Sequence, residues 1–167
     1  MKKGLLIGII LTLIALISVP IISGANDSTE VLIGHEWCRT GKEFEIKVYI
    51  NPSTNIGGWE IYKLRFNTHR VYVTEVIPGP EWDSFFFDCG TIDNDAGEIT
   101  EIQTLKFGEY PDFNHVACII KGISLRAGIS EFTIDDMDIC NDQFELIPYT
   151  SESGYLFSIP RVFRWRL

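Results

Sequence analysis

Beyond residue 25, apolar and polar side chains alternate along the chain with a period of two. Alternation of this kind is found in residues 62–66, 71–77, 119–125 and 132–135. The clearest run has apolar side chains at Phe44, Ile46, Val48 and Ile50. Because successive side chains of a strand point to opposite faces, this period predicts short strands that each bury one face.

Turn-forming residues separate these runs at intervals of about ten residues. Examples are Asn51–Asn55, Pro78–Pro80 and Asp93–Gly97. No stretch after residue 25 has the spacing of an amphipathic helix with caps. The pattern predicts an all-β domain of about nine strands, arranged as an antiparallel β-sandwich with jelly-roll topology.

The first 25 residues have the pattern of a secretory signal peptide. Lys2 and Lys3 precede an apolar run from Gly4 to Ser18, and Ser23–Ala25 places small residues where a signal peptidase cleaves. An uncleaved membrane anchor is the alternative, since the 19 residues Gly4–Ile22 are just long enough to span a bilayer. Either way the domain lies outside the cell, secreted or held at the cell surface. The expected divisions are a leader at residues 1–25, a β-sandwich at 26–158 and a basic tail at 159–167.

The charge of the exported part excludes two kinds of partner. The whole chain has a net charge of −9, which becomes −11 without Lys2 and Lys3. Nucleic acid and anionic membranes are recognised by clustered Lys and Arg, so neither is expected to bind. The tail is the exception, and it can dock on the acidic domain, touch an anionic surface or stay unattached. Its arginines are Arg161, Arg164 and Arg166.

The sequence shows no catalytic motif, and we predict no enzymatic activity. His35, His69 and His115 share no ligand spacing, and neither G-x-S-x-G nor H-E-x-x-H occurs. Four cysteines are present, none in a C-x-x-C pair. Outside the cell they can form two disulfides, and free buried thiols are the alternative. The cysteines are Cys38, Cys89, Cys118 and Cys140.

Two acidic segments suggest calcium as a candidate ligand. Asp93, Asp95 and Glu98 begin like a calcium loop and are weak ligand candidates. Gly97 stands where a third acidic ligand is needed, and an Asx-rich hairpin turn is the simpler interpretation. A solvated strand end likewise explains the acidic residues of 135–142. No cofactor is therefore expected.

An aromatic cluster follows the turn at Pro78–Pro80. Trp82, Phe85 and Phe87 can form a platform that stacks on sugar rings, and packing in the core or against an edge strand is the alternative.

The order of these segments resembles that of the cohesin domain, the module of cellulosome scaffolds that binds a dockerin on a partner protein. The resemblance covers roughly Thr29 to Ser158. It rests on the glycine-led run Ile56–Phe66, on Val71–Gly79 with its V-x-P-G-like turn, and on Val116–Leu125 followed by Gly128 and its strand. The chain departs from the family at Asn67-Thr68, where Asp-Pro is common, and in its four cysteines.

The resemblance implies which face of the sandwich binds. In the family, the sheet built from strands eight, three, six and five meets the dockerin. On the third strand, Tyr62, Leu64 and Phe66 are expected to point inward. The outward positions are expected to be Trp59, Ile61, Lys63 and Arg65. The expected partner contacts are Trp59, Ile61, Lys63, Arg65, Asn141, Asp142 and Glu145. The same topology implies disulfides between Cys38 and Cys89 and between Cys118 and Cys140.

These observations predict a non-catalytic extracellular module that binds a dockerin-like partner and is linked to polysaccharide breakdown. A carbohydrate-binding module of the same fold is one alternative, with the site at Trp82, Phe85 and Phe87. A structural protein of the cell surface without a specific ligand is the other.

Overall fold

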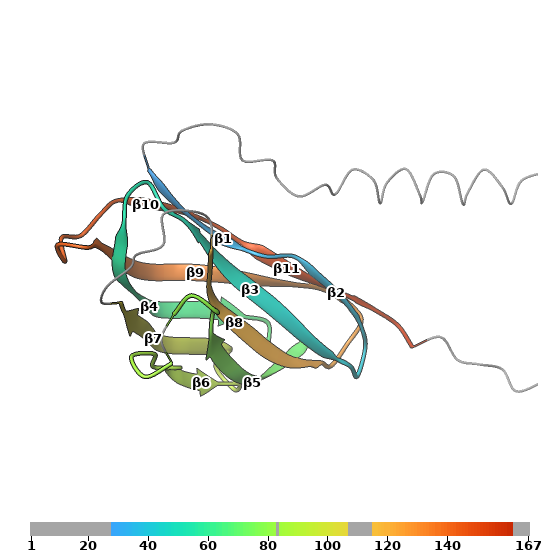
Figure 1. Cartoon of the computed structure of the whole chain (residues 1–167). Helices are drawn as coiled ribbons and strands as arrows, with labels where there is room; N and C mark the ends of the chain where they lie inside the picture. The colour runs from blue at the N-terminus through green and yellow to red at the C-terminus, as the bar shows by residue number, and fades with distance from the viewer. Residues whose placement is uncertain (1–27, 83, 107–114, 162–167) are drawn as a thin grey trace, which may run out of the picture.

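Strands form where the alternation predicts them. The computed structural model describes residues 28–82, 84–106 and 115–161 (Figure 1). In chain order the strands are β1 (Thr29–Ile33), β2 (Glu36–Arg39), β3 (Glu43–Asn51), β4 (Ile56–Phe66), β5 (Val71–Pro78), β6 (Thr91–Asp93), β7 (Glu98–Leu105), β8 (His115–Ser124), β9 (Gly128–Asn141), β10 (Tyr149–Glu152) and β11 (Gly154–Ile159).

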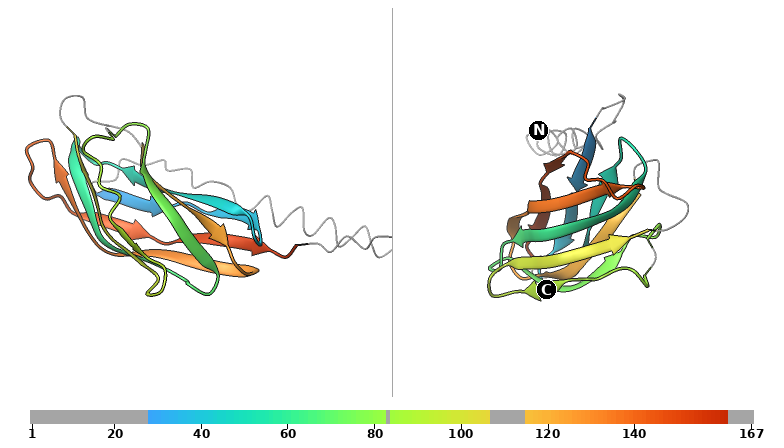
Figure 2. Two further views of the ribbon diagram at one scale, coloured as in Figure 1. Left: turned by 90° about the horizontal axis from the view of Figure 1, so that it is seen from below. Right: turned by 90° about the vertical axis from the view of Figure 1, so that its left-hand side faces the viewer.

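The strands form two sheets that face each other as the layers of a sandwich (Figure 2). One sheet has five strands in the order β10-β1-β3-β8-β5, and the other has six in the order β2-β11-β9-β4-β7-β6. The predicted all-β jelly-roll sandwich is confirmed. The strand count exceeds nine because the first and last strands of the chain each divide between the two sheets, as β1 with β2 and as β10 with β11. The pairs β1–β10 and β2–β11 are parallel, so the sandwich is not antiparallel throughout.

The core lies between the two sheets and consists of the inward positions of both. Its largest fully buried side chains include Phe132, Ile46, Ile50, Leu64 and Leu156. Burial of one such side chain stabilises the fold by about 1.5–3 kcal/mol. All core residues of the described part of the chain fall between Val31 and Leu156, so residues 26–167 contain the complete sandwich.

The alternation of β4 is interrupted in its middle. Its register with β9 shifts between Ile61 and Lys63, where β4 has Tyr62 as an extra residue, and again between Lys63 and Leu64, where β9 has Asp135 as an extra residue. The first shift marks a β-bulge of β4 at Tyr62 and Lys63. A bulge inserts one residue and reverses the direction of the side chains beyond it. Trp59 and Ile61 are therefore buried, at 3% and 0% exposure, while Tyr62 lies outside at 38%. The predicted outward positions of Trp59 and Ile61, and the inward position of Tyr62, are wrong for this reason.

All four cysteines are free thiols, which contradicts the expected disulfides. Cys38 lies in β2, at one edge of the six-stranded sheet, whereas Cys89 precedes β6 at the opposite edge. Strands are about 4.8 Å apart, so this separation far exceeds the reach of a disulfide, about 7 Å between Cα atoms. Cys118 in β8 and Cys140 in β9 belong to different sheets, which pack about 10 Å apart.

The expected leader, residues 1–25, lies outside the described residues, as does most of the basic tail. Within the described part, no helix has the length and apolar character needed to cross a membrane.

Candidate functional site

A groove of about 640 Å³ lies on the outer face of the six-stranded sheet, at the end where β4 begins and β9 ends. Its floor is formed by β4, β7 and β9, and Gly58 leaves a position of that floor without a side chain. One wall is the Phe85–Cys89 loop between β5 and β6. The other is the turn after β9, which carries Phe144 and Leu146. We call this surface the apolar groove.

Large apolar side chains are exposed on both walls and on the floor of the apolar groove. The exposed fractions are 84% for Phe85, 70% for Leu146, 51% for Phe144 and 43% for Leu105. Single exposed apolar residues are ordinary on a protein surface, but a contiguous group around a hollow marks an interaction site.

The first wall is fixed to the sheet by aromatic packing. Trp82 meets Trp59 edge to face at 5.8 Å between ring centroids, and Phe87 meets Trp59 at 6.1 Å. Trp82 is buried and Phe87 is half-buried, so they act as anchors of the loop. The row of exposed aromatics predicted at Trp82, Phe85 and Phe87 is therefore not formed, and only Phe85 projects into solvent. Phe85 packs edge to face on Phe86 at 5.0 Å.

The second wall is a tight turn organised by Asn141. Its side-chain oxygen accepts hydrogen bonds from the backbone N–H groups of Gln143 and Glu145, at 3.0 and 2.9 Å. Phe144 in this turn has a φ of 61°, in the left-handed region that a bulky side chain rarely adopts. Strain of this kind gathers at functional sites, because the surrounding structure must hold it in place.

The rim of the apolar groove is acidic. Glu60, Asp88 and Asp138 line it, and no Lys or Arg does among the described residues. The Tyr62 hydroxyl donates a hydrogen bond of 3.0 Å to Asp138 Oδ2. This bond to a carboxylate, with some burial, raises the pKa of Tyr62 to about 12. At neutral pH Tyr62 is therefore a neutral hydrogen-bond donor at the rim.

The other predicted contact residues lie around the apolar groove rather than in it. Lys63 pairs with Glu98 at 3.2 Å, and Arg65 pairs with Asp135 at 2.6 Å. The outward positions predicted for Lys63 and Arg65 are confirmed, since both reach the outer face beside the bulge. Their role in partner binding remains a prediction.

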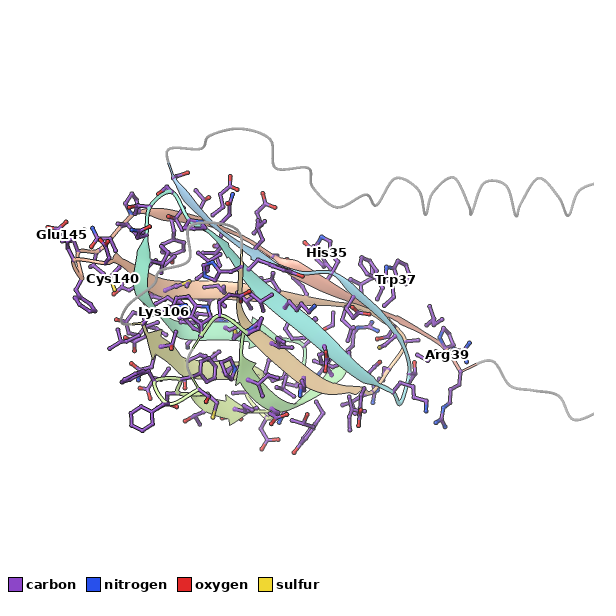
Figure 3. All side chains as sticks on the ribbon, in the orientation of Figure 1. His35, Trp37, Arg39, Lys106, Cys140 and Glu145 are labelled. Carbon is purple, nitrogen blue, oxygen red and sulfur yellow. The ribbon has the colours of Figure 1, made fainter. Side chains whose placement is uncertain are left out.

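Asp142 and Glu145 belong to the turn that forms the second wall. Asp142 accepts a hydrogen bond of 3.2 Å from Asn55, and Glu145 Oε2 accepts one of 3.3 Å from Asn141. Figure 3 shows Glu145 and Cys140 together at this end of the molecule. The structure thus brings Asn141, Asp142 and Glu145 to one edge of the apolar groove, while their contact with a partner remains a prediction.

Asp93 and Glu98, two of the calcium-ligand candidates, bind neighbouring protein groups. Asp93 Oδ1 accepts the backbone N–H groups of Asp95 and Ala96, both at 2.9 Å, which is the Asx turn foreseen as the simpler interpretation. Glu98 pairs with Lys63. The described ranges contain no group of three or more His, Cys, Asp or Glu side chains that could hold a metal ion.

A second exposed surface, which the sequence interpretation missed, lies at the other end of the same sheet. Trp37 of β2 is 54% exposed and stacks on Phe157 of β11, with 4.5 Å between centroids and 17° between planes. Tyr155 and His35 continue the row at 5.4 Å from each other. We call His35, Trp37, Tyr155 and Phe157 the aromatic strip; His35 and Trp37 are labelled in Figure 3. The sequence does contain a signal for this strip, because aromatic side chains stand at alternate positions in residues 35–37 and 155–157 and therefore share one face of each strand.

No protein-family model matches the sequence, and no curated protein matches it. Solved structures do match, and they include several cohesins. A cohesin of Clostridium acetobutylicum, solved in complex with a dockerin, aligns with a TM-score of 0.70 and 16% identity, over 79% of this chain and all of that one.

Two further structures agree. A cohesin of Clostridium thermocellum named Coh-OlpC, solved with the dockerin Doc435, aligns with a TM-score of 0.67 and 19% identity, over 83% of this chain and 98% of that one. The non-cellulosomal cohesin of the archaeon Archaeoglobus fulgidus aligns with a TM-score of 0.66 and 12% identity, over 79% and 91%. This chain therefore has the cohesin fold, as the resemblance in its sequence predicts.

Proposed function

We propose that this chain is a non-catalytic extracellular binding module that holds a dockerin-like module of a partner protein in the apolar groove. The groove lies on β9-β4-β7-β6. These strands correspond in order to strands eight, three, six and five of the cohesin pattern, the sheet on which dockerins bind in that family. Several of the matching cohesins were solved as complexes with dockerins.

The observation that carries the proposal is the exposure of Phe85, Leu105, Phe144 and Leu146 around one hollow. Burial of such side chains by a partner supplies the apolar core that stable interfaces have at their centre. Trp59 supports the hollow from the core side, because Trp82 and Phe87 of the groove's first wall pack against its ring.

The expected signal peptide or anchor at residues 1–25 supports a function outside the cell. An exported module that holds other proteins without modifying them acts as a scaffold, and its cohesin resemblance connects that scaffold to the breakdown of extracellular polysaccharide. The acidic surface of the exported part, with a net charge of −11, agrees with a protein partner and not with nucleic acid.

The test is capture of dockerin modules by residues 26–167. Immobilised protein is exposed to the secreted proteins of the source organism and to purified dockerins of the matching complexes, and bound proteins are identified by mass spectrometry. Dockerin-bearing proteins should be retained by the parent and lost from a Leu146→Asp variant. Retention by Leu146→Asp as strong as by the parent would place the site elsewhere.

A second candidate function is carbohydrate binding at the aromatic strip. The favouring observation is the exposed Trp37 ring, held in place by its stacking on Phe157. Aromatic rings fixed in this way can pack on the apolar faces of sugar rings. Glu131, which accepts a hydrogen bond of 3.1 Å from the Tyr155 hydroxyl, adds a polar group beside the strip. Binding to insoluble cellulose or chitin that is lost in Trp37→Ala, and unchanged in Leu146→Asp, would support it.

A further inference from the structure

The apolar groove has a chemistry that specifies what can fill it. Its walls are apolar, and the charged side chains that line it are all carboxylates among the described residues. A segment that combines apolar side chains with Lys or Arg would cover both features at once, whereas an acidic or purely polar segment would not. The exported part of this chain carries such a segment after its last strand.

The segment is residues 162–167, with the sequence Val-Phe-Arg-Trp-Arg-Leu. In an extended conformation alternate side chains share a side. Phe163, Trp165 and Leu167 would then point one way, and Arg164 and Arg166 the other. The apolar row matches the exposed walls of the groove, and the two arginines match its acidic rim. The remainder of the exported chain, residues 26–161, has a net charge of −13.

The segment cannot reach the groove of its own copy. β11 ends beside the start of β9, where Ser158 pairs with Gly128, while the groove lies near the other end of β9 at Cys140. The twelve residue-to-residue steps from Gly128 to Cys140 span about 40 Å along the strand. The eight steps from Ile159 to Leu167 span at most about 28 Å when the chain is fully extended, and β11 runs away from the groove. Figure 3 shows the two ends, with Arg39 beside the end of β11 and Cys140 at the other side.

We propose that residues 162–167 of one copy of this chain bind in the apolar groove of a second copy. The contact joins two different surfaces, so repetition gives a closed pair that exchanges segments or a longer head-to-tail assembly. The proposal uses the same groove as dockerin binding but does not depend on it. Where both hold, self-association and dockerin capture compete for one surface.

The first test is the molar mass of residues 26–167 in solution, measured by sedimentation over a range of concentrations. The mass should rise with concentration and fall toward the monomer in high salt, because the screening length shortens from about 10 Å at 0.1 M to about 3 Å at 1 M. Arg164→Glu with Arg166→Glu should weaken association about tenfold or more, as should Leu146→Asp. Ile129→Asp is the matched control, since Ile129 is 57% exposed on the same sheet outside the groove.

The second test mixes the two defective variants. The Arg164→Glu/Arg166→Glu protein keeps an intact groove, and the Leu146→Asp protein keeps an intact segment. Each alone should be monomeric, whereas the mixture should form a one-to-one complex that free peptide 159–167 dissociates. A parent that stays monomeric at every concentration would overturn the inference, and so would a mixture without a complex while circular dichroism shows both variants folded.

Dockerin capture by the Arg164→Glu/Arg166→Glu variant separates this inference from the proposed function. If that variant captures dockerins and the parent does not self-associate, the inference about residues 162–167 is wrong and the proposed function stands. If the parent self-associates in the predicted pattern but captures no dockerin, the proposed function is wrong and the inference stands.

Discussion

At the residue scale, Trp59 connects the core to the candidate site. It is 3% exposed, and two aromatic residues of the groove wall, Trp82 and Phe87, pack against its ring. Its burial could not be foreseen from the alternation alone, because a strict period of two through Phe66 places Trp59 outside. The bulge at Tyr62 and Lys63 shifts the phase, and nothing in the local sequence marks that bulge.

Trp59→Ala should therefore destabilise the fold as well as the groove. Removal of a buried tryptophan side chain costs about 3–5 kcal/mol in the free energy of unfolding, measured by chemical denaturation. Phe85→Ala is the control, since its side chain is 84% exposed and its loss should change stability by less than about 1 kcal/mol. Similar stability of both variants would contradict the buried position of Trp59.

The cysteines give a prediction about reactivity. Cys118 is fully buried, which raises the pKa of its thiol to about 12, whereas Cys89 is exposed. Because the thiolate is the reactive form, a thiol reagent at mild alkaline pH should modify Cys89 first and Cys118 only after unfolding. Denatured protein that has not been reduced should show four thiols by this account. Detection of two free thiols would show that one disulfide is present, and detection of none would show that both disulfides expected from the sequence are formed.

Tyr62 gives a prediction about pH. Its pKa in the fold is about 12, above the usual 10.0, because the protonated hydroxyl donates to Asp138. The neutral form is the one that the fold favours, so its stabilising effect is complete below pH 10 and is lost as the pH rises through 12. The difference in tyrosinate absorbance between the parent and Tyr62→Phe should titrate near pH 12. A midpoint near 10 would show that the bond to Asp138 is absent.

At the scale of elements, the strands and their order were predictable and the groove was not. Alternation fixes which residues of β3 are buried, because one face of that strand is toward the core along its whole length. In β5 a register shift between Val73 and Glu75 interrupts the alternation, so Val76 and not Glu75 is buried. The groove depends on a loop and a turn that meet over the ends of three strands. Phe85 and Leu146 are 61 positions apart in the sequence, and only the pairing of β4 with β7 and β9 brings them to one surface.

The turn after β9 is the element in which strain and exposure coincide. Phe144→Gly removes a half-exposed aromatic ring and places a residue that accepts a φ of 61° without cost. The variant should keep its free energy of unfolding within about 1 kcal/mol of the parent, because relief of strain offsets the lost contacts. Dockerin capture should weaken at the same time. A loss of both stability and capture would mean that Phe144 is a structural residue of the turn.

At the scale of the whole molecule, the six-stranded sheet presents two separate surfaces on one face. The apolar groove lies at the end where β9 finishes, and the aromatic strip runs along β2 and β11 at the edge of the sheet (Figure 3). The five-stranded sheet covers the opposite side of the core (Figure 2). Two surfaces this far apart can be altered one at a time, so a variant of each serves as the control for the other.

The central claim is that the apolar groove binds a dockerin-like partner. The most direct measurement is the affinity of a captured dockerin for three proteins, namely the parent, Leu146→Asp and Trp37→Ala. Both altered side chains are exposed, at 70% and 54%, so neither change should unfold the domain. Leu146→Asp should weaken binding at least about tenfold, whereas Trp37→Ala should leave it unchanged. Equal binding by the parent and Leu146→Asp, or loss of binding in Trp37→Ala alone, would contradict the central claim.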